Sequence, residues 1–293
     1  TVSTSDSEFT DSQTITVTVN AVNDAPVADA TSGVTEEDQS IVISLSGSDV
    51  DGDNLSFSVQ NASNGSVSLD ASFATYTPDA NYSGTDSFIF TVSDGLETSE
   101  ATVTLNISAV NDAPVLATVS DVSFDEDGSG STSLSASDVD GDDLTYSISE
   151  GTDITATLTD SDISFSAPDN FNGSETFTVS TSDSEFTDSQ TITVTVNAVN
   201  DAPVANTTSS ETVEDQSVVV SLSGSDIDGD NLSFSLDTDA INGSITLDGS
   251  LATYTPDANY SGTDSFIFTV SDGIETSEAA VTLNISAVND APV

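Results

Sequence analysis

The chain has 293 residues, including 51 Asp or Glu but no Lys, Arg, His or Cys, so its formal net charge is −51 at pH 7. Without cationic side chains it cannot neutralise phosphates, which excludes nucleic-acid binding and a basic membrane-binding patch. Without Cys no disulfide can stabilise small domains, and bound metal is the expected substitute.

A seven-residue segment organises the chain. Ala-Val-Asn-Asp-Ala-Pro-Val occurs at residues 21–27, 109–115, 198–204 and 287–293, and this regular period predicts a tandem array. Its Pro fixes φ and donates no backbone hydrogen bond, so the segment reads as a stiff, extended linker. The predicted repeats are 28–115, 116–204 and 205–293. Residues 1–27 are predicted to be the C-terminal stub of a preceding repeat plus its linker. They are identical to residues 178–204, so we expect the chain to be a piece of a longer protein.

In chain order, the first repeat alternates apolar and small polar residues over 41–45, 55–59, 88–92 and 103–107. This period of two is typical of half-buried antiparallel strands. Roughly seven strands per repeat, with turn signals between them, predict an all-β chain of immunoglobulin-like Greek-key sandwiches in an elongated array. Asn64-Gly65 and Asn242-Gly243 predict two-residue hairpin turns. Tyr82 and Tyr260 each precede a strand and predict a structural corner tyrosine.

An acidic loop follows the second predicted strand of each repeat, with the sequence Ser-Asp-Val/Ile-Asp-Gly-Asp. Alternate Asp residues before a Gly turn can direct several carboxylates at one hard cation, and calcium prefers six to eight oxygen ligands. The alternative is a polar turn in which Asp and Gly serve the backbone. An EF-hand does not fit, because strands flank the loop and Gln60 takes the twelfth position. The candidate ligands are Asp49, Asp51, Asp53, Asp138, Asp140, Asp142, Asp226, Asp228 and Asp230.

Other acids recur at fixed places in each repeat. Each alone reads as an exposed turn residue, and the case for a shared role rests on their joint recurrence. One Glu lies near the first strand, one Asp ends the Phe-rich strand, and the linker supplies Asn-Asp. They are Glu37, Glu126 and Glu214; Asp94, Asp183 and Asp272; and Asn23, Asp24, Asn111, Asp112, Asn200, Asp201, Asn289 and Asp290.

These motifs, together with Val-Ser-Asp-Gly, resemble cadherin-type repeats, specifically the bacterial cadherin-like tandem repeats of large RTX-type surface adhesins. The resemblance implies calcium between neighbouring repeats. The first site would join Asn23, Asp24, Asp49, Asp51 and Asp94. The second would join Glu37, Asn111, Asp112, Asp138, Asp140 and Asp183. The third would join Glu126, Asn200, Asp201, Asp226, Asp228 and Asp272. A fourth would begin with Glu214, Asn289 and Asp290. The chain departs from the cadherin pattern at Ala109 and Ala198, where an acid is usual.

The resemblance implies a calcium-rigidified extender of an extracellular bacterial adhesin, secreted by a type I system, whose partners are calcium ions and neighbouring repeats of a monomeric rod. We expect this segment to insert into no membrane. The alternative is a calcium-dependent module that binds glycans or a second copy. An enzyme is disfavoured, because a Ser nucleophile would lack its usual base and the acids recur in every repeat.

Overall fold

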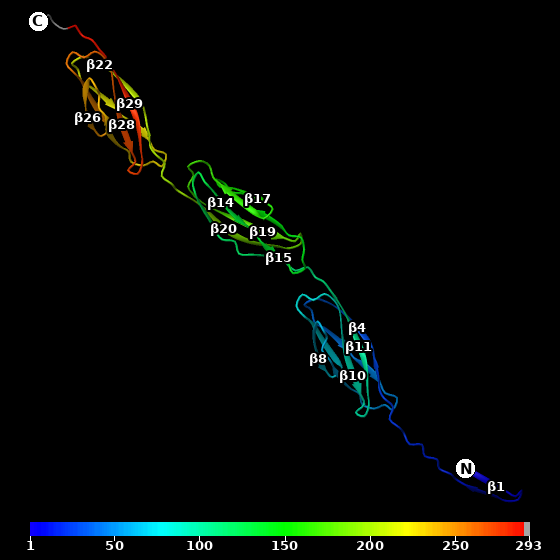
Figure 1. Ribbon diagram of the computed structural model, residues 1–293. Helices are drawn as coiled ribbons and strands as arrows, with labels where there is room; N and C mark the ends of the chain where they lie inside the picture. Colours follow the sequence, from blue (N-terminus) through cyan, green and yellow to red (C-terminus); the bar gives the residue numbers. More distant parts are fainter. Residues whose placement is uncertain (290–293) are drawn as a thin grey trace. The chain divides into compact units, whose positions relative to one another are not determined.

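The computed structural model describes residues 1–289, and every regular element among them is a β-strand (Figure 1). No helix that could cross a membrane was found in this range. The residues divide into two compact units. The first contains residues 1–113 and 138–143, and the second contains residues 114–137 and the described residues from 144 onward.

The strands recur with the sequence repeats. Residues 1–26 carry β1 (Val2–Ser5) and β2 (Thr10–Gln13). The first repeat carries β3 (Val27–Asp29), β4 (Thr31–Glu36), β5 (Ile41–Ser44), β6 (Ser46–Ser48), β7 (Ser56–Val59), β8 (Gly65–Asp70), β9 (Phe73–Pro78), β10 (Gly84–Ser93) and β11 (Thr98–Ser108). The second carries β12 (Val115–Leu116), β13 (Val122–Asp125), β14 (Ser129–Ser133), β15 (Ala136–Ser137), β16 (Thr145–Ile148), β17 (Thr155–Thr159), β18 (Asp162–Ser166), β19 (Gly173–Ser182) and β20 (Thr187–Asn197). The third carries β21 (Val204–Ala205), β22 (Thr208–Val213), β23 (Val218–Ser221), β24 (Gly224–Ser225), β25 (Ser233–Thr238), β26 (Gly243–Asp248), β27 (Leu251–Pro256), β28 (Gly262–Ser271) and β29 (Thr276–Ser286).

Each repeat is a two-layer sandwich. In the first, one sheet has the order β4-β11-β10-β7 and the other β5-β9-β8, while the short strands β3 and β6 pair with each other. The second and third repeats have the same topology, with sheets β13-β20-β19-β16 and β14-β18-β17, then β22-β29-β28-β25 and β23-β27-β26. The predicted all-β sandwich is therefore confirmed.

Two details of strand pairing differ from the sequence prediction. The first strand is split into β3 and β4 and the second into β5 and β6, so about seven predicted strands appear as nine segments. In addition, β4 runs parallel to β11, as β13 does to β20 and β22 to β29. The pattern of alternating residues fixes which face of a strand is buried but does not encode the direction of its neighbour.

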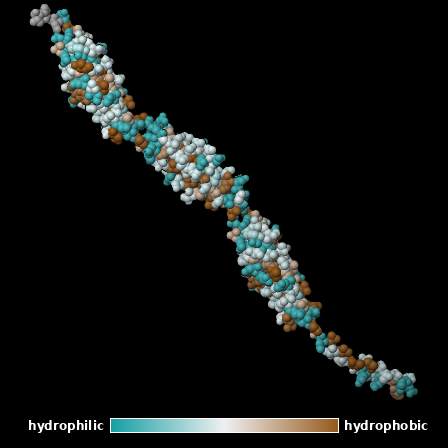
Figure 2. Space-filling view, in the orientation of Figure 1, coloured by the Kyte–Doolittle hydropathy of each residue, from teal (hydrophilic) through white to brown (hydrophobic). Residues whose placement is uncertain are grey.

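The alternating apolar residues form the cores. In the first repeat, Phe88, Phe90 and Val92 of β10 and Val103 and Leu105 of β11 have exposed fractions of 2% or less. They pack with inward-facing residues of the opposite sheet, such as Ile43, Ala74 and Tyr76. The second and third repeats have equivalent clusters. Figure 2 shows that, on the face drawn, hydrophobic residues lie scattered among hydrophilic ones instead of forming one continuous patch.

The Asn-Gly hairpin prediction is wrong. Gly65 begins β8, but β7 pairs with β10 and β8 with β9, so the segment before Gly65 crosses from one sheet to the other. The Gly is needed for close packing, because a Cβ there would lie 2.6 Å from the Thr77 carbonyl oxygen and 2.6 Å from the Tyr76 ring. The tight hairpin lies between β8 and β9, where Ala71 has a φ of 54°.

The corner tyrosines lie as the sequence predicts. The Tyr82 hydroxyl donates to the Thr85 carbonyl over 2.8 Å, and the Tyr260 hydroxyl donates to the Thr263 carbonyl over 2.7 Å. Each bond ties the loop to the first residues of the strand that follows, so the role is structural.

Candidate metal centre

The first Asp of each acidic loop organises the loop itself. Asp49 Oδ1 accepts hydrogen bonds from the amides of Asp51 (2.8 Å) and Asp53 (3.3 Å). Asp138 Oδ1 accepts from the amides of Asp140 and Asp142 in the same way, and Asp226 Oδ1 accepts from the amide of Asp230 over 3.2 Å. These turns bring three carboxylates together in every repeat, with one oxygen of each within 4.8 Å of the others: Asp49, Asp51 and Asp53; Asp138, Asp140 and Asp142; Asp226, Asp228 and Asp230.

The second Asp of each loop binds the linker backbone. The amide of Asp24 donates to Asp51 Oδ2, that of Asp112 to Asp140 Oδ2, and that of Asp201 to Asp228 Oδ2, each over 2.8 Å. The predicted linker acids and loop acids are therefore close together at all three places.

The linker Asn contacts the Asp at the end of the Phe-rich strand. Asn23 Nδ2 donates to Asp94 Oδ2 over 2.9 Å, and Asn200 Nδ2 donates to Asp272 Oδ2 over 2.9 Å. The amide of Glu97 and the Asn23 side chain lower the pKa of Asp94. The Asn200 side chain and the amide of Ile274 do the same for the pKa of Asp272. Both carboxylates are thus stabilised in the charged form that a cation requires.

The predicted Glu residues are buried at the opposite end of each sandwich. Glu37, Glu126 and Glu214 have exposed fractions of 4%, 6% and 8%. The Glu37 amide donates to the Ser108 carbonyl over 3.0 Å, and Glu37 Oε1 accepts from the Val110 amide over 2.5 Å. Glu126 and Glu214 make the same pair of contacts. Each Glu therefore joins the end of the first long strand to the linker that leaves the last one.

One cluster contains acids from three separate segments of the second unit. Glu126, Asp201 and Asp228 each place a carboxylate oxygen within 4.8 Å of the other two. Burial and then the neighbouring charges of Asp228, Asp127 and Glu126 raise the pKa of Asp201. In the first unit, burial and the charge of Asp140 likewise raise the pKa of Asp112. Ionising these carboxylates therefore costs free energy unless a cation is present.

The hydrogen-bonding state of these oxygens tests whether the residues fit calcium. Within residues 1–289, seven buried side-chain oxygen or nitrogen atoms have no hydrogen-bond partner. Six are carboxylate oxygens of predicted ligands: Oδ2 of Asp49, Asp112, Asp138, Asp201 and Asp226, and Oε2 of Glu126. Buried carboxylate oxygens are normally paired, and oxygen is the ligand that calcium prefers, so the residues fit this ion.

The structure does not test every predicted ligand. Asp183 belongs to the second unit, where its Oδ1 accepts from the amides of Glu185 and Phe186. Its convergence with Asp112 stays a prediction. Asp290 lies outside the described residues, so the fourth predicted site, with Glu214 and Asn289, also stays a prediction.

Sequence reasoning missed a buried acid on the Phe-rich strand. Asp86 is 7% exposed, and its carboxylate accepts from the amides of Ser63, Asn64 and Ser87 and from the Tyr76 hydroxyl. Asp264 has the equivalent partners in the third repeat. The period-two pattern places Asp86 on the same face as Phe88, and this signal could have revealed it. Because every contact comes from the protein, the acid stabilises the loop before β8 and is no metal candidate.

The acid after each buried Glu also has a role that sequence reasoning did not assign. Asp38 Oδ1 accepts from the Asn81 amide over 3.1 Å, and Asp127 Oδ1 accepts from the Asn170 amide over 3.0 Å. Both acids have a left-handed backbone, with φ of 57° and 59°. They hold a neighbouring loop, and their negative charges contribute to the raised pKa of Asp112 and of Asp201.

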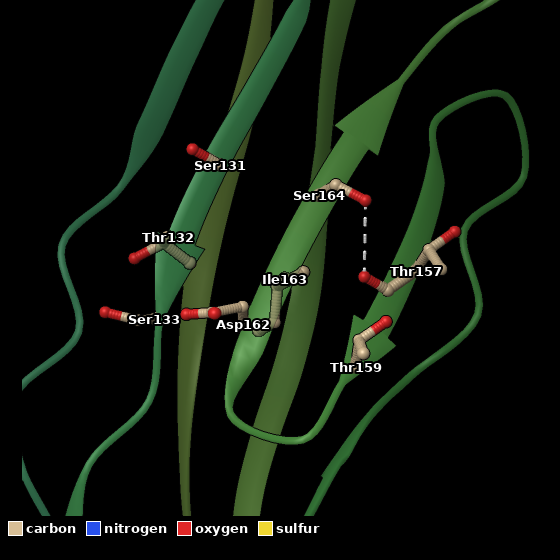
Figure 3. A pocket seen from close by; sticks show the side chains of 8 residues that line it. All are labelled: Ser131, Thr132, Ser133, Thr157, Thr159, Asp162, Ile163 and Ser164. Atoms are coloured by element: carbon tan, nitrogen blue, oxygen red, sulfur yellow. Dashed lines mark hydrogen bonds between the residues drawn. The ribbon is translucent and has the colours of Figure 1, made fainter.

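A hollow lies on the outer face of the β14-β18-β17 sheet (Figure 3). Its side chains are mostly hydroxyls, and Ser164 Oγ donates to the Thr157 carbonyl over 3.4 Å. The hollow contains one acid, Asp162, and no aromatic ring on which a sugar could stack. It offers neither a metal cluster nor the usual features of a glycan site.

Comparisons with known proteins agree with this fold. The family of bacterial Ig domains matches residues 23–106, 111–195 and 200–284. The sequence matches none of the curated proteins. Among solved structures, extracellular repeats 1–4 of the protocadherin PcdhgB3 align with a TM-score of 0.53 and 13% identity, covering 90% of this chain and 76% of that one. Repeats 1–4 of protocadherin gamma B7 give a TM-score of 0.50 and 14% identity, covering 89% and 75%.

An endo-fucoidan hydrolase of glycoside hydrolase family 107 also aligns, with 20% identity and a TM-score of 0.29, covering 88% of this chain. This chain spans 43% of that enzyme's length, and a likeness this weak says nothing of activity. The three matched segments correspond to the three sandwiches of the structure. The chain belongs to the bacterial Ig domain family, of which it carries three cadherin-like copies in tandem.

Proposed function

We propose that the chain is a calcium-rigidified extender of a bacterial cell-surface adhesin, which holds ligand-binding domains away from the cell. The six unpartnered carboxylate oxygens carry this proposal, because they gather where linker and loop acids meet. In the second unit, calcium would be held by Glu126, Asp201, Asp226 and Asp228. When bound, calcium supplies the positive charge that these acids lack.

The contacts of the linker explain how binding would affect its motion. Domains joined by a short linker and a small interface swivel by default. Here the linker backbone is already tied on one side to the buried Glu and on the other to the second loop Asp, through the amides of Val199 and Asp201. The carboxylates at those ties repel one another, so a cation shared by both sides would remove the repulsion and restrict the swivel.

An extender role is favoured over a binding role by the uniformity of the repeats. The same strands and sheets recur three times, and such arrays serve to stack and project. Tandem Ig-like domains are typically extracellular and without catalytic activity, and we place this chain at the cell surface. Extracellular calcium modules bind with Kd of about 10⁻⁴–10⁻³ M, which suits calcium outside cells and not inside them. Secretion by a type I system, in an RTX-type adhesin, is part of the proposal.

The test compares small-angle scattering of the purified chain in millimolar calcium and in chelator. We expect calcium to narrow the distribution of conformations and to protect the amides of residues 198–202 from hydrogen exchange. Scattering and exchange that are identical in both buffers would contradict the proposal. If calcium changes the scattering and the exchange but the chain binds no sugar on a glycan array, the result favours an extender over a glycan-binding module.

A charge-matched pair of variants locates the effect. Asp226→Asn with Asp228→Asn should abolish calcium protection of the linker in the second unit. Asp237→Asn with Asp239→Asn removes the same charge from an exposed segment outside the cluster and should leave that protection intact. Equal loss in both variants would show that the effect depends on net charge and not on ligands.

A further inference from the structure

The chain carries many copies of a motif that its calcium sites do not use. Of its 18 Asn residues, 11 stand two places before Ser or Thr, with no Pro between. This is the acceptor motif for Asn-linked glycosylation, which marks surface segments of secreted proteins. Ser and Thr are abundant in this chain, so the motif alone carries little weight, and the structure must decide.

Six of the motif residues have exposed side chains in the structure. Asn54 in the acidic loop, Asn81 before β10 and Asn106 on β11 are exposed, and so are Asn231, Asn259 and Asn284 at the matching places of the third repeat. None of these six side-chain amides makes a hydrogen bond to the described part of the chain. Among the other motif residues, Asn206 donates to the Ser223 hydroxyl over 3.4 Å.

Three Asn residues outside the motif are held by the fold. Asn23 and Asn200 donate their side-chain amides to Asp94 and Asp272 in the linker clusters. Asn197 donates its amide to Asp125 Oδ1 over 3.1 Å. Each of these Nδ2 atoms is therefore engaged in the fold, while the six motif amides are free to react.

Local geometry gives a transferase access to two of the free amides. Asn81 has a φ of 57° and Asn259 a φ of 58°, so each sits at the bend of a loop. Their backbone amides are fixed by Asp38 and Asp215, which hold the loop while the side chain stays in solvent. The next-but-one residues, Ser83 and Ser261, are exposed as well, so the whole acceptor motif is accessible.

We propose that Asn54, Asn81 and Asn106, with Asn231, Asn259 and Asn284, are acceptors for Asn-linked sugars. The donor would be a sugar whose anomeric carbon carries a diphosphate leaving group, attached to a nucleotide or a lipid. The bond from anomeric carbon to phosphate oxygen breaks, and a bond from that carbon to Asn Nδ2 forms. Nδ2 loses one proton to the transferase base, and the diphosphate carrier leaves with the electron pair.

Such sugars would stand on exposed positions of the repeats and leave the calcium ligands untouched. They would add neutral, hydrated bulk to a chain whose charge is otherwise all negative. The proposal is independent of calcium binding, so either can fail without the other.

The test is peptide mapping by mass spectrometry of the protein isolated from the bacterium that makes it. A protease that cuts at Asp and Glu is needed, because the chain contains no Lys or Arg. We expect a sugar mass on peptides that contain Asn54, Asn81 or Asn106. A single sugar would indicate a nucleotide-linked donor, and an assembled oligosaccharide a lipid-linked one.

Two controls make the result decisive. Motifs with Asn-Gly, such as Asn64-Gly65, are not scored, because spontaneous deamidation alters their mass without an enzyme. The variant Ser83→Ala keeps Asn81 but removes its motif, and it should lose the sugar at Asn81 while Asn54 keeps its own. Unmodified Asn at all six positions would overturn the proposal, and so would a sugar that persists on Asn81 in Ser83→Ala.

Discussion

The core of the second repeat contains a buried hydroxyl that has no hydrogen-bond partner and no counterpart at the matching place of the other two repeats. Thr181 on β19 is fully buried, and its Oγ1 has no hydrogen-bond partner. The matching residues of the other repeats, Val92 and Val270, are also fully buried but present a methyl group instead. Among the seven unpartnered buried atoms, this is the one that no cation would satisfy. Burying this unpaired hydroxyl therefore lowers the free energy of unfolding of the second repeat.

Thr181→Val should stabilise the second repeat. The change removes a buried, unpaired hydroxyl at nearly constant volume, which should raise the free energy of unfolding by about 1–2 kcal/mol. Urea unfolding followed by amide exchange within residues 116–197 measures it. Val270→Thr introduces the same hydroxyl into the third repeat and should lower that repeat's stability by a similar amount. A destabilised Thr181→Val protein would mean that the hydroxyl has an unseen partner.

The buried carboxylate of Asp86 makes the stability of the first repeat depend on pH. Burial tends to raise its pKa, but hydrogen bonds from the amides of Asn64 and Ser87 and the Tyr76 hydroxyl outweigh this, and the net pKa lies below 3.8. A lowered pKa in the folded chain means that stability is fully present above the unfolded pKa of 3.8. It is lost as the pH falls through the lower, folded value.

Asp86→Asn should show the size of this contribution. At pH 7 the substitution replaces one carboxylate oxygen with an NH2 group, so the part-buried amide of Ser63 or of Asn64 loses its acceptor, at a cost of about 1–3 kcal/mol. As the pH falls below 3.8 and through the lower, folded pKa, the difference from the unmodified chain should shrink, because the carboxylate then becomes protonated in both folded and unfolded chains. Exchange of the Asn64 amide, measured across this pH range, would follow it. A difference that stays constant with pH would rule out the ionised carboxylate as its source.

At the scale of strands, the alternation of apolar and polar residues predicted which side chains are buried. It failed where burial depends on a neighbouring sheet. The inward residues of 88–92 and 103–107 are buried as the alternation predicts. Residues 1–27 show the limit, because they have the same sequence as 178–204. Ile15 and Val17 are 61% and 80% exposed, whereas their counterparts Ile192 and Val194 are fully buried. The same strand sequence is buried only where the opposing sheet is present.

The linker sites show the same limit. The sequence predicted that linker and loop acids would meet, and the contacts of Asp112 and Asp201 agree with this. It could not show which oxygen of each carboxylate accepts hydrogen bonds from the backbone amides, because that depends on the geometry of the turn. It also did not predict the contact of Asp38 with the Asn81 amide, and it left out Asp86, because both roles follow from loops that are distant in sequence.

A loop between sheets gives a prediction at this scale. Gly65→Ala should destabilise the first repeat, because its Cβ would overlap the Thr77 carbonyl and the Tyr76 ring, and overpacking of this kind costs about 1–3 kcal/mol. Asn64→Ala should change stability little, because the neighbouring loop uses only the Asn64 backbone groups. Thermal unfolding of both variants tests whether Gly65 is needed for close packing or for a hairpin turn. A hairpin turn would instead make Asn64→Ala the more harmful change.

At the scale of the whole chain, 51 acids without a single basic side chain must be balanced by solvent cations. Two mechanisms could supply this balance. Monovalent salt screens charges over a Debye length of about 10 Å at 0.1 M, without regard to position. Calcium would instead bind at the six unpartnered oxygens, whose neighbours lie within a few ångströms. The two mechanisms differ in their dependence on salt.

Raising NaCl from 0.1 to 0.5 M should therefore fail to replace calcium. Screening weakens the repulsion between all the acids, but it places no cation on the buried oxygens of Asp112, Glu126 and Asp201. The linker amides should therefore still exchange with solvent. Millimolar calcium added in 0.5 M NaCl should still protect residues 109–113 and 198–202. Magnesium at the same concentration is the control for charge, and it should protect less, because it demands octahedral geometry and keeps its water. If NaCl alone gave the full protection, the acids would act through their summed charge, and no specific ion would be needed.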